Sequence, residues 1–231
     1  MLMMKSFMHN RKLVFALAIL ATVLLTSTTC LADVIGSAYL NNAASTNAVI
    51  GFSHGAADVT FSVPSPTNPA CSGIFSGDTL CFNSGAAGNG YTLGGFLATG
   101  GATVLTGSAA ALAANLNNTV FEFTGTVTVT TGEMFQAGHD DGLQLRIGSI
   151  LVINAPGPTG FTTTPATYTG PSGTLAFDLV YGECCGPPAL LGISLPLISP
   201  PAAAPEPSSL VLLGSALFGC LAVRLRRRKA M

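Results

Sequence analysis

The segment Thr119-Val-Phe-Glu-Phe-Thr-Gly-Thr-Val-Thr-Val129 contains the most regular pattern in the chain. Apolar residues at positions 121, 123, 127 and 129 alternate with Glu122 and with threonines at 126, 128 and 130. A period of two is typical of a β-strand that buries one face and exposes the other. Threonine, valine and phenylalanine also favour strands. We therefore predict a long strand with a threonine-rich outer face.

Similar patterns recur on both sides of this segment. We predict strands at 134–137, 143–147, 150–153, 175–181 and 190–197, and two or three more between Asp33 and Val63. The glycine-dense stretch 85–101 is expected to form turns, Pro156 to Pro171 a long loop, and alanine-rich Ser108 to Leu116 the only helix of the body. Many short strands separated by turns indicate an all-β fold, an antiparallel β-sandwich of the jelly-roll-like kind.

Both ends of the chain have the composition of processing segments. Three basic residues precede the apolar run Leu13 to Leu25, and small residues follow it up to Ala32, which predicts a secretory signal peptide and signal helix at residues 1–32. At the other end, Pro205-Glu206-Pro207 precedes the apolar run Leu210 to Val223 and a cluster of arginines. We predict a hydrophobic helix in this C-terminal segment, residues 205–231, and a secreted domain at residues 33–204.

The C-terminal order of elements resembles the PEP-CTERM sorting tail of exported bacterial proteins. In this sequence the motif is Pro205, Glu206 and Pro207, followed by the apolar run and the arginines. The resemblance implies recognition and cleavage by an exosortase-type membrane protease, after transient anchoring in the inner membrane. It also implies delivery to the cell envelope, the outer surface or the extracellular matrix. The alternative is an ordinary tail anchor, which would keep the protein in the membrane.

Charge is distributed unevenly along the chain. Eight of the nine basic residues lie in the two terminal segments, so residues 33–204 contain one base, Arg146, and nine acids. One minus nine gives a net charge of −8 for this domain. An acidic surface repels phosphate backbones, so nucleic acid is excluded as a partner, whereas cations are attracted.

Four cysteines lie in the secreted domain: Cys71, Cys81, Cys184 and Cys185. Export favours disulfides, and four cysteines allow three pairings. We predict a Cys71–Cys81 bridge around a short loop. Cys184 and Cys185 then either form a bridge between neighbours or each pair elsewhere. A zinc site is disfavoured because the cysteine spacing does not fit one.

A second resemblance covers about Val120 to Leu195. The segments Phe123-Thr-Gly125, His139-Asp140-Asp141-Gly142 and Leu179-Val-Tyr181-Gly-Glu183 resemble the β-sandwich domain first named from anthrax protective antigen. In sugar-binding members of that family, two adjacent aspartates joined by a cis peptide hold a calcium ion, and the ion also binds sugar hydroxyls. The resemblance implies this role for Asp140 and Asp141. The remaining ligands would have to come from another loop, and Glu183 and the backbone near Cys185 and Gly186 are our candidates for them.

The residues themselves also allow a simpler interpretation of this segment. Asp-Gly is a common hairpin turn, so Asp140 and Asp141 could serve only to shape a turn. We expect His139 to be an exposed turn residue. Arg146 is expected to pair with Asp140, Asp141 or another strand carboxylate.

Catalysis is not indicated. The secreted domain has two histidines, which leaves little choice of a general base, and no spacing singles out a pair of its carboxylates for glycoside hydrolysis. We therefore expect a non-catalytic exported protein that binds extracellular polysaccharide, with calcium as the cofactor. The alternative is a purely structural component of a biofilm or exopolysaccharide matrix that has no specific ligand.

Overall fold

A computed structural model describes residues 34–63, 79–84 and 90–197. All the described residues belong to one compact unit. The predicted signal peptide, Cys71, the motif Pro205-Glu206-Pro207 and the C-terminal helix lie outside the described residues. Within them, no helix has the length and apolar character needed to cross a membrane.

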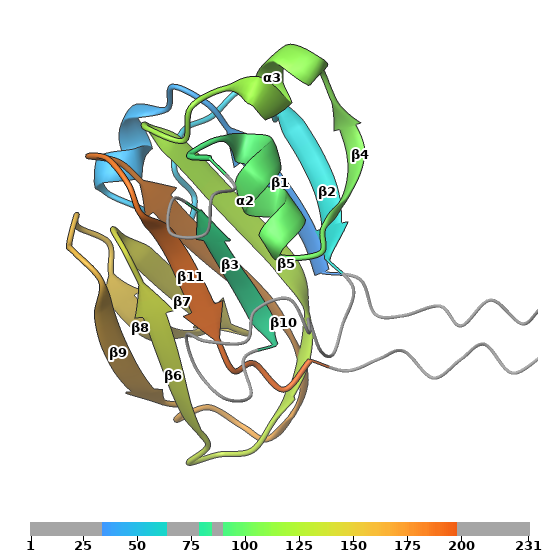
Figure 1. The fold of residues 1–231 in the computed structure, drawn as a ribbon. Coiled ribbons are helices and arrows are strands. Elements are labelled where there is room, and N and C mark those ends of the chain that lie inside the picture. Colours follow the sequence, from blue (N-terminus) through green and yellow to red (C-terminus); the bar gives the residue numbers. More distant parts are fainter. Residues whose placement is uncertain (1–33, 64–78, 85–89, 198–231) are drawn as a thin grey trace, which may run out of the picture. The chain divides into compact units, whose positions relative to one another are not determined.

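Two antiparallel sheets contain all the named strands (Figure 1). The larger sheet has the order β4 (Thr103–Gly107), β2 (Val59–Val63), β1 (Val34–Tyr39), β5 (Thr119–Val129), β10 (Gly173–Glu183), β7 (Leu143–Ile147) and β8 (Ile150–Ala155). The smaller sheet has the order β3 (Leu80–Ser84), β11 (Ala189–Ile193), β6 (Met134–His139) and β9 (Thr162–Thr167). The expected all-β, antiparallel architecture is therefore confirmed.

The strands β5 and β10 form the centre of the larger sheet. They pair over eleven positions, from Gly173 opposite Val129 to Glu183 opposite Thr119. The predicted alternation holds in β5, where Phe121, Phe123 and Val127 are buried. Threonines at 124, 126 and 128 lie on the other face and are exposed. This long pairing brings the end of β10 next to the start of β5.

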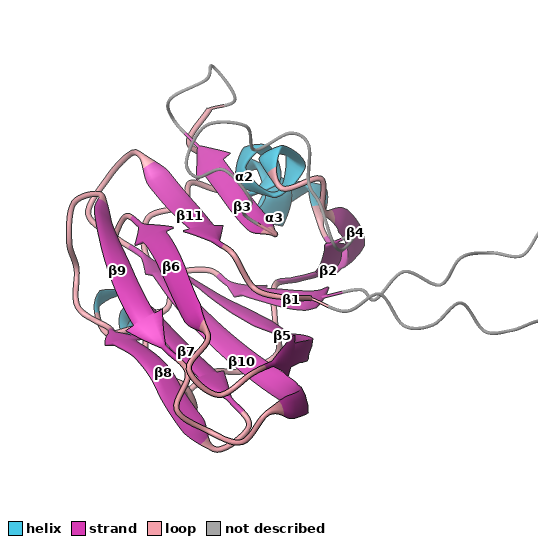
Figure 2. Ribbon diagram, turned by 90° about the horizontal axis from the view of Figure 1, so that it is seen from below, coloured by secondary structure: helices cyan, strands magenta, loops and turns pink. Residues whose placement is uncertain are grey.

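The core lies between the two sheets (Figure 2). Phe82 of the smaller sheet packs 5.4 Å from Phe123 of the larger one, measured between ring centroids. Phe96 stacks on Phe82 at 5.1 Å and also contacts Phe121 and Tyr181. Burial of these aromatic side chains contributes to the stability of the sandwich, together with the aliphatic residues of the same core.

Phe96 belongs to a helix in the segment that was expected to form turns. Helix α2 (Leu93–Thr99) begins after Thr92, whose side chain accepts a hydrogen bond from the Gly95 backbone N–H. Its buried residues, Leu93, Phe96 and Leu97, follow helical spacing and face the core. The interpretation of this stretch as turns was wrong for residues 93–99, where core packing outweighs the low helix propensity of Gly94 and Gly95. Gly100 and Gly101, which follow the helix, do form a turn.

The predicted alanine-rich helix exists in shortened form as α3 (Ala109–Ala113), capped by Ser108. It is not the only helix, since α2 and the short 3-10 helix η1 (Ala43–Thr46) are also present. Two strands, β1 and β2, occupy the described part of the 33–63 region. The expected loop 156–171 is partly wrong, because β9 forms within it and pairs along β6 from Thr162 opposite His139 to Thr167 opposite Met134.

Candidate functional site

Three loops converge at the end of the sandwich where β10 finishes. They are the β6–β7 turn (140–142), the β8–β9 loop (156–161) and the β10–β11 loop (184–188). The backbone N–H of Asp140 donates to Leu190 O at 2.9 Å, and that of Asp141 donates to Thr159 O at 2.8 Å. Through their backbone, the two aspartates that were predicted as a metal site therefore join their turn to β11 and to the β8–β9 loop.

The turn has a conformation that its sequence explains. Asp141 has a positive φ of 73°, which aspartate tolerates better than most residues. A Cβ on the next residue, Gly142, would lie 2.1 Å from Pro156 O, so no side chain fits there. Among the described residues the cis peptide bond is Pro187–Pro188. The Asp140–Asp141 bond is trans, contrary to the cis bond that the family resemblance implied.

Both aspartate side chains are buried, with exposed fractions of 8% for Asp140 and 3% for Asp141. Oδ2 of Asp141 accepts a 2.7 Å hydrogen bond from the backbone N–H of Cys184. Backbone hydrogen bonds from Thr159 and Phe161 reach the carboxyls of Asp141 and Asp140, respectively. Burial nevertheless raises the pKa of both carboxyls.

Glu183 is the third acidic group at this end, and it is fully buried. The Tyr181 hydroxyl donates to its Oε2 at 2.5 Å, and the Tyr91 hydroxyl donates to its Oε1. Burial is the main reason that the pKa of Glu183 is raised to about 8. The hydrogen bonds from the two tyrosines lower this pKa, and repulsion from Asp141 and Asp140 raises it further. Because both carboxylate oxygens already have tyrosine partners, Glu183 is a packed structural group in this conformation and not the open donor we expected.

His139 is buried, so the prediction of an exposed turn residue was wrong. Its Nδ1 lies 2.6 Å from Asp141 O, and its Nε2 lies 2.8 Å from Thr164 Oγ1. A carbonyl oxygen can only accept, so Nδ1 carries the proton and Nε2 accepts from the threonine hydroxyl. Burial lowers the pKa of His139, which agrees with a neutral ring. His139 therefore brings no positive charge to the aspartates.

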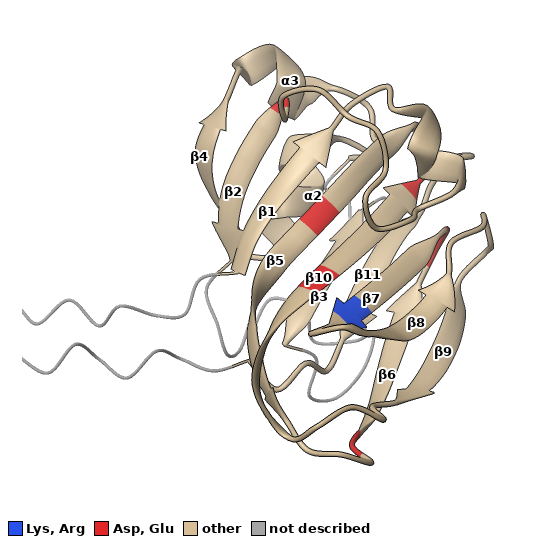
Figure 3. Ribbon diagram, turned by 180° about the vertical axis from the view of Figure 1, so that it is seen from behind, with Lys and Arg blue, Asp and Glu red and all other residues tan. Residues whose placement is uncertain are grey.

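Arg146 is the one lysine or arginine in the part of the chain that the structure describes, and it is engaged elsewhere. Its Nη2 lies 2.8 Å from Oδ2 of Asp178, directly across the β7–β10 pairing (Figure 3). Of the partners that we predicted for it, another strand carboxylate is the correct one. Asp140 and Asp141 consequently have no basic side chain of the described residues to balance their charge.

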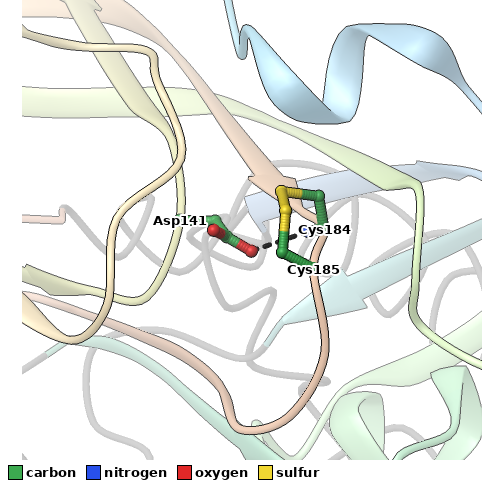
Figure 4. A group of neighbouring side chains, drawn as sticks. All are labelled: Asp141, Cys184 and Cys185. Carbon is green, nitrogen blue, oxygen red and sulfur yellow. Dashed lines mark hydrogen bonds between the residues drawn. A yellow bond between two sulfur atoms is a disulfide. The ribbon is translucent and has the colours of Figure 1, made fainter.

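The cysteines adjoin the aspartates. Cys184 and Cys185 form a disulfide between sequence neighbours, which decides between the two pairings left open (Figure 4). A carboxylate oxygen of Asp141 and the two sulfurs lie within 4.8 Å of one another. Because disulfide sulfurs are not thiolates, these three residues do not form a metal site. Cys81 is also disulfide-bonded, and its predicted partner Cys71 lies outside the described residues.

Sequence reasoning missed the two tyrosines that hold Glu183. Tyr181 and Glu183 are two apart on one strand and so share a face, a signal that was available in the sequence. Tyr91 is 92 positions from Glu183 and gives no comparable local signal.

A search against family models matches residues 203–228 to the PEP-CTERM protein-sorting motif. The chain carries a PEP-CTERM sorting motif. The match contains the predicted residues Pro205, Glu206 and Pro207, and it confirms this part of the sequence interpretation. A protein with a PEP-CTERM motif is exported, then sorted and anchored at the membrane. No match was found among curated proteins.

Solved structures similar to this chain include two PA14 domains, the kind of domain that the sequence motifs resemble. The PA14 domain of the antifreeze protein MpAFP is 18% identical, with a TM-score of 0.48 and coverage of 75% of this chain and 83% of that one. The PA14 sugar-binding domain from an RTX adhesin is 21% identical, with a TM-score of 0.47 and coverage of 71% and 90%. A β-glucosidase from Kluyveromyces marxianus is 10% identical, with a TM-score of 0.34 and coverage of 76% and 18%.

Proposed function

We propose that this exported protein binds extracellular polysaccharide through a calcium ion held by Asp140 and Asp141. The observation that carries the proposal is the burial of two adjacent carboxylates, at exposed fractions of 8% and 3%, with no basic side chain of the described residues beside them. Burial of unpaired charge is costly, and a bound cation removes that cost. The raised pKa of both groups is the expected sign of such an unbalanced pair.

The donors at this end of the sandwich suit calcium. Calcium takes six to eight oxygen ligands, which carboxylates and backbone carbonyls supply. Asp140 and Asp141 would hold the ion, with carbonyl groups of the β10–β11 loop as further donors. Asp141 has one carboxylate oxygen engaged by the Cys184 N–H, and this bond also fixes the direction of the carboxylate. A bound calcium ion would offer its remaining positions to a pair of neighbouring sugar hydroxyls.

The sorting motif supports a location where such a ligand is met. We propose that an exosortase-type protease processes the tail and that the domain then acts at the cell envelope or in the extracellular matrix. The domain has a net charge of −8, so calcium would also reduce repulsion from acidic polysaccharides. We propose no catalytic role.

The test is binding of the purified protein to a glycan array in calcium and in EDTA, beside the Asp140→Asn/Asp141→Asn variant. Calcium-dependent binding that the variant lacks supports the proposal. Asp178→Asn is the matched control, because it removes the same charge from the Arg146 pair and should bind as the wild type does. Equal binding in calcium and EDTA would contradict the calcium site, and no binding in either would instead favour the alternative of a structural matrix component with no specific ligand.

A further inference from the structure

The surroundings of the two aspartates contain apolar groups that the calcium proposal does not use. We infer that the Phe161 ring and the Cys184–Cys185 disulfide are the apolar contacts for the ring of a bound saccharide unit. The inference rests on the proposed function and specifies what the ligand must look like: a cyclic sugar with neighbouring hydroxyls on one edge and a carbon face free to pack.

Phe161 lies beside Asp140. It belongs to the β8–β9 loop, and its backbone hydrogen-bonds the Asp140 carboxyl. Its side chain is 50% exposed, although phenylalanine is among the residues most often buried. Most phenylalanines of the described residues belong to the core, among them Phe82, Phe96 and Phe123. Phe161 therefore differs from these phenylalanines, because its ring is exposed while its backbone binds a buried carboxyl group.

The disulfide lies beside Asp141. Cys184 is buried and donates its backbone N–H to Oδ2 of Asp141, whereas Cys185 is exposed. A carboxylate oxygen of Asp141 and both sulfurs lie within 4.8 Å of one another, and Figure 4 shows the carboxylate directed toward the disulfide. The structure thus places the disulfide beside Asp141, and Phe161 gives the loop that binds Asp140 an exposed aromatic side chain.

This arrangement matches the chemistry of a sugar. A pyranose has hydroxyls around its edge, which bind cations and carboxylates, and C–H groups on its faces, which pack on apolar surfaces. Aromatic rings supply such a surface, and sulfur makes comparable soft contacts. A cation at the aspartates would hold the hydroxyl edge, while Phe161 and the disulfide would contact the carbon face. An open-chain polyol would satisfy the cation equally well but has no such face.

Calorimetry can separate the two parts of the site. The probes are calcium alone, then the methyl glycosides of glucose, galactose, mannose and fucose, and the open-chain polyol sorbitol, all in excess calcium. The variants are Phe161→Ala and Cys184→Ala/Cys185→Ala. Met134→Ala is the control, because Met134 is 80% exposed at the start of β6, at the other end of that strand from the aspartates.

For Phe161→Ala we expect calcium affinity within about twofold of the wild type and affinity for the preferred glycoside about tenfold lower. Sorbitol binding should not change, and Met134→Ala should match the wild type throughout. The disulfide variant should also lose glycoside affinity, and a methyl glycoside bound to the wild type should show NOEs to the Cys185 β-protons. These NOEs do not depend on whether the variant folds.

Two failures are distinguishable. If the wild type binds glycosides with calcium but Phe161→Ala binds them equally well, or no NOE to Cys185 appears, the inference is wrong for that group and the proposed function stands. If the wild type binds calcium but none of the glycosides, the proposed function fails and the inference fails with it.

Discussion

The backbone N–H of Cys184 donates a 2.7 Å hydrogen bond to Oδ2 of Asp141, a residue 43 positions earlier in the chain. The bond joins the β6–β7 turn to the β10–β11 loop. Two properties of the Asp141 carboxylate therefore matter. Its oxygen accepts the hydrogen bond that joins the turn to the loop, and its negative charge is what would bind a cation. An asparagine retains the first property and removes the second.

Asp141→Asn should fold with a calcium-free melting temperature at or above that of the wild type, because it removes a buried charge but keeps an acceptor for Cys184. Its melting temperature should not respond to calcium. Asp141→Ala should lose about 1–3 kcal/mol of stability, since it leaves the Cys184 N–H without a partner. Thermal unfolding with and without calcium measures both effects, and a calcium-dependent rise in Asp141→Asn would argue against the aspartate as a ligand.

The pKa of Glu183 predicts an unusual pH dependence. Its pKa is about 8 in the fold against an ordinary 4.5, so the folded state holds the proton more tightly than the unfolded state. The contribution of Glu183 to stability should therefore be present below about pH 4.5 and be lost as the pH rises to about 8, with a slope of up to about 1.4 kcal/mol per pH unit.

Burial of His139 acts in the opposite direction. Its pKa is lowered from 6.5, so its contribution to stability falls as the pH drops below that value. The effect of Glu183 is therefore best measured as the difference between the wild type and Glu183→Gln in urea unfolding at pH 5 and pH 8 in EDTA. The wild type should lose more stability than the variant between these two pH values. Equal slopes would show that Glu183 does not titrate in this window.

Gly36 should be intolerant of any side chain. A Cβ at this position of β1 would lie 2.2 Å from the Phe61 ring on the paired strand β2. Gly36→Ala should therefore destabilise the fold by about 1–3 kcal/mol, because the ring must move within a packed core. Gly55→Ala is the matched control, since a Cβ added there would have no atom within 4 Å. Chemical denaturation should show a lower midpoint for Gly36→Ala alone.

The PEP-CTERM motif predicts where the protein accumulates. Replacing Pro205, Glu206 and Pro207 with alanine should leave the apolar run and arginines intact but prevent sorting, so unprocessed protein should collect in the membrane fraction. Deleting residues 205–231 should release the protein or misplace it. Fractionation and immunoblotting distinguish these outcomes. Normal localisation of either variant would show that the motif does not direct sorting.

The regular strands were predictable because local alternation and core burial agree. In β5 and β7 each apolar residue of the pattern faces the core, and Gly148-Ser149 joins β7 to β8 as expected. Elements that depend on distant contacts were not predictable. Helix α2 exists because Phe96 packs on Phe82 and Phe121, and β9 exists because β6 offers it a partner.

In the site, too, features that depend on distant contacts were not predictable from the local sequence. Adjacent aspartates followed by glycine indicated a hairpin turn, but β6 and β7 belong to different sheets, and residues 140–142 instead form a bend that leads the chain from one sheet to the other. Burial of His139 and the contact of Tyr91 with Glu183 depend on side chains 25 and 92 positions away, respectively, and local patterns do not encode such distances. The sequence motif could identify Asp140 and Asp141 as candidates, but their burial without a basic partner is evident only from the fold.

The most direct test of the central claim is calorimetric titration of calcium into the oxidised protein, beside Asp140→Asn/Asp141→Asn and the control Asp178→Asn. The account predicts binding in the micromolar-to-millimolar range in the wild type and the control, and none in the double variant. No heat of binding and no thermal shift in the wild type would contradict it, and would leave Asp140 and Asp141 as residues that shape a turn.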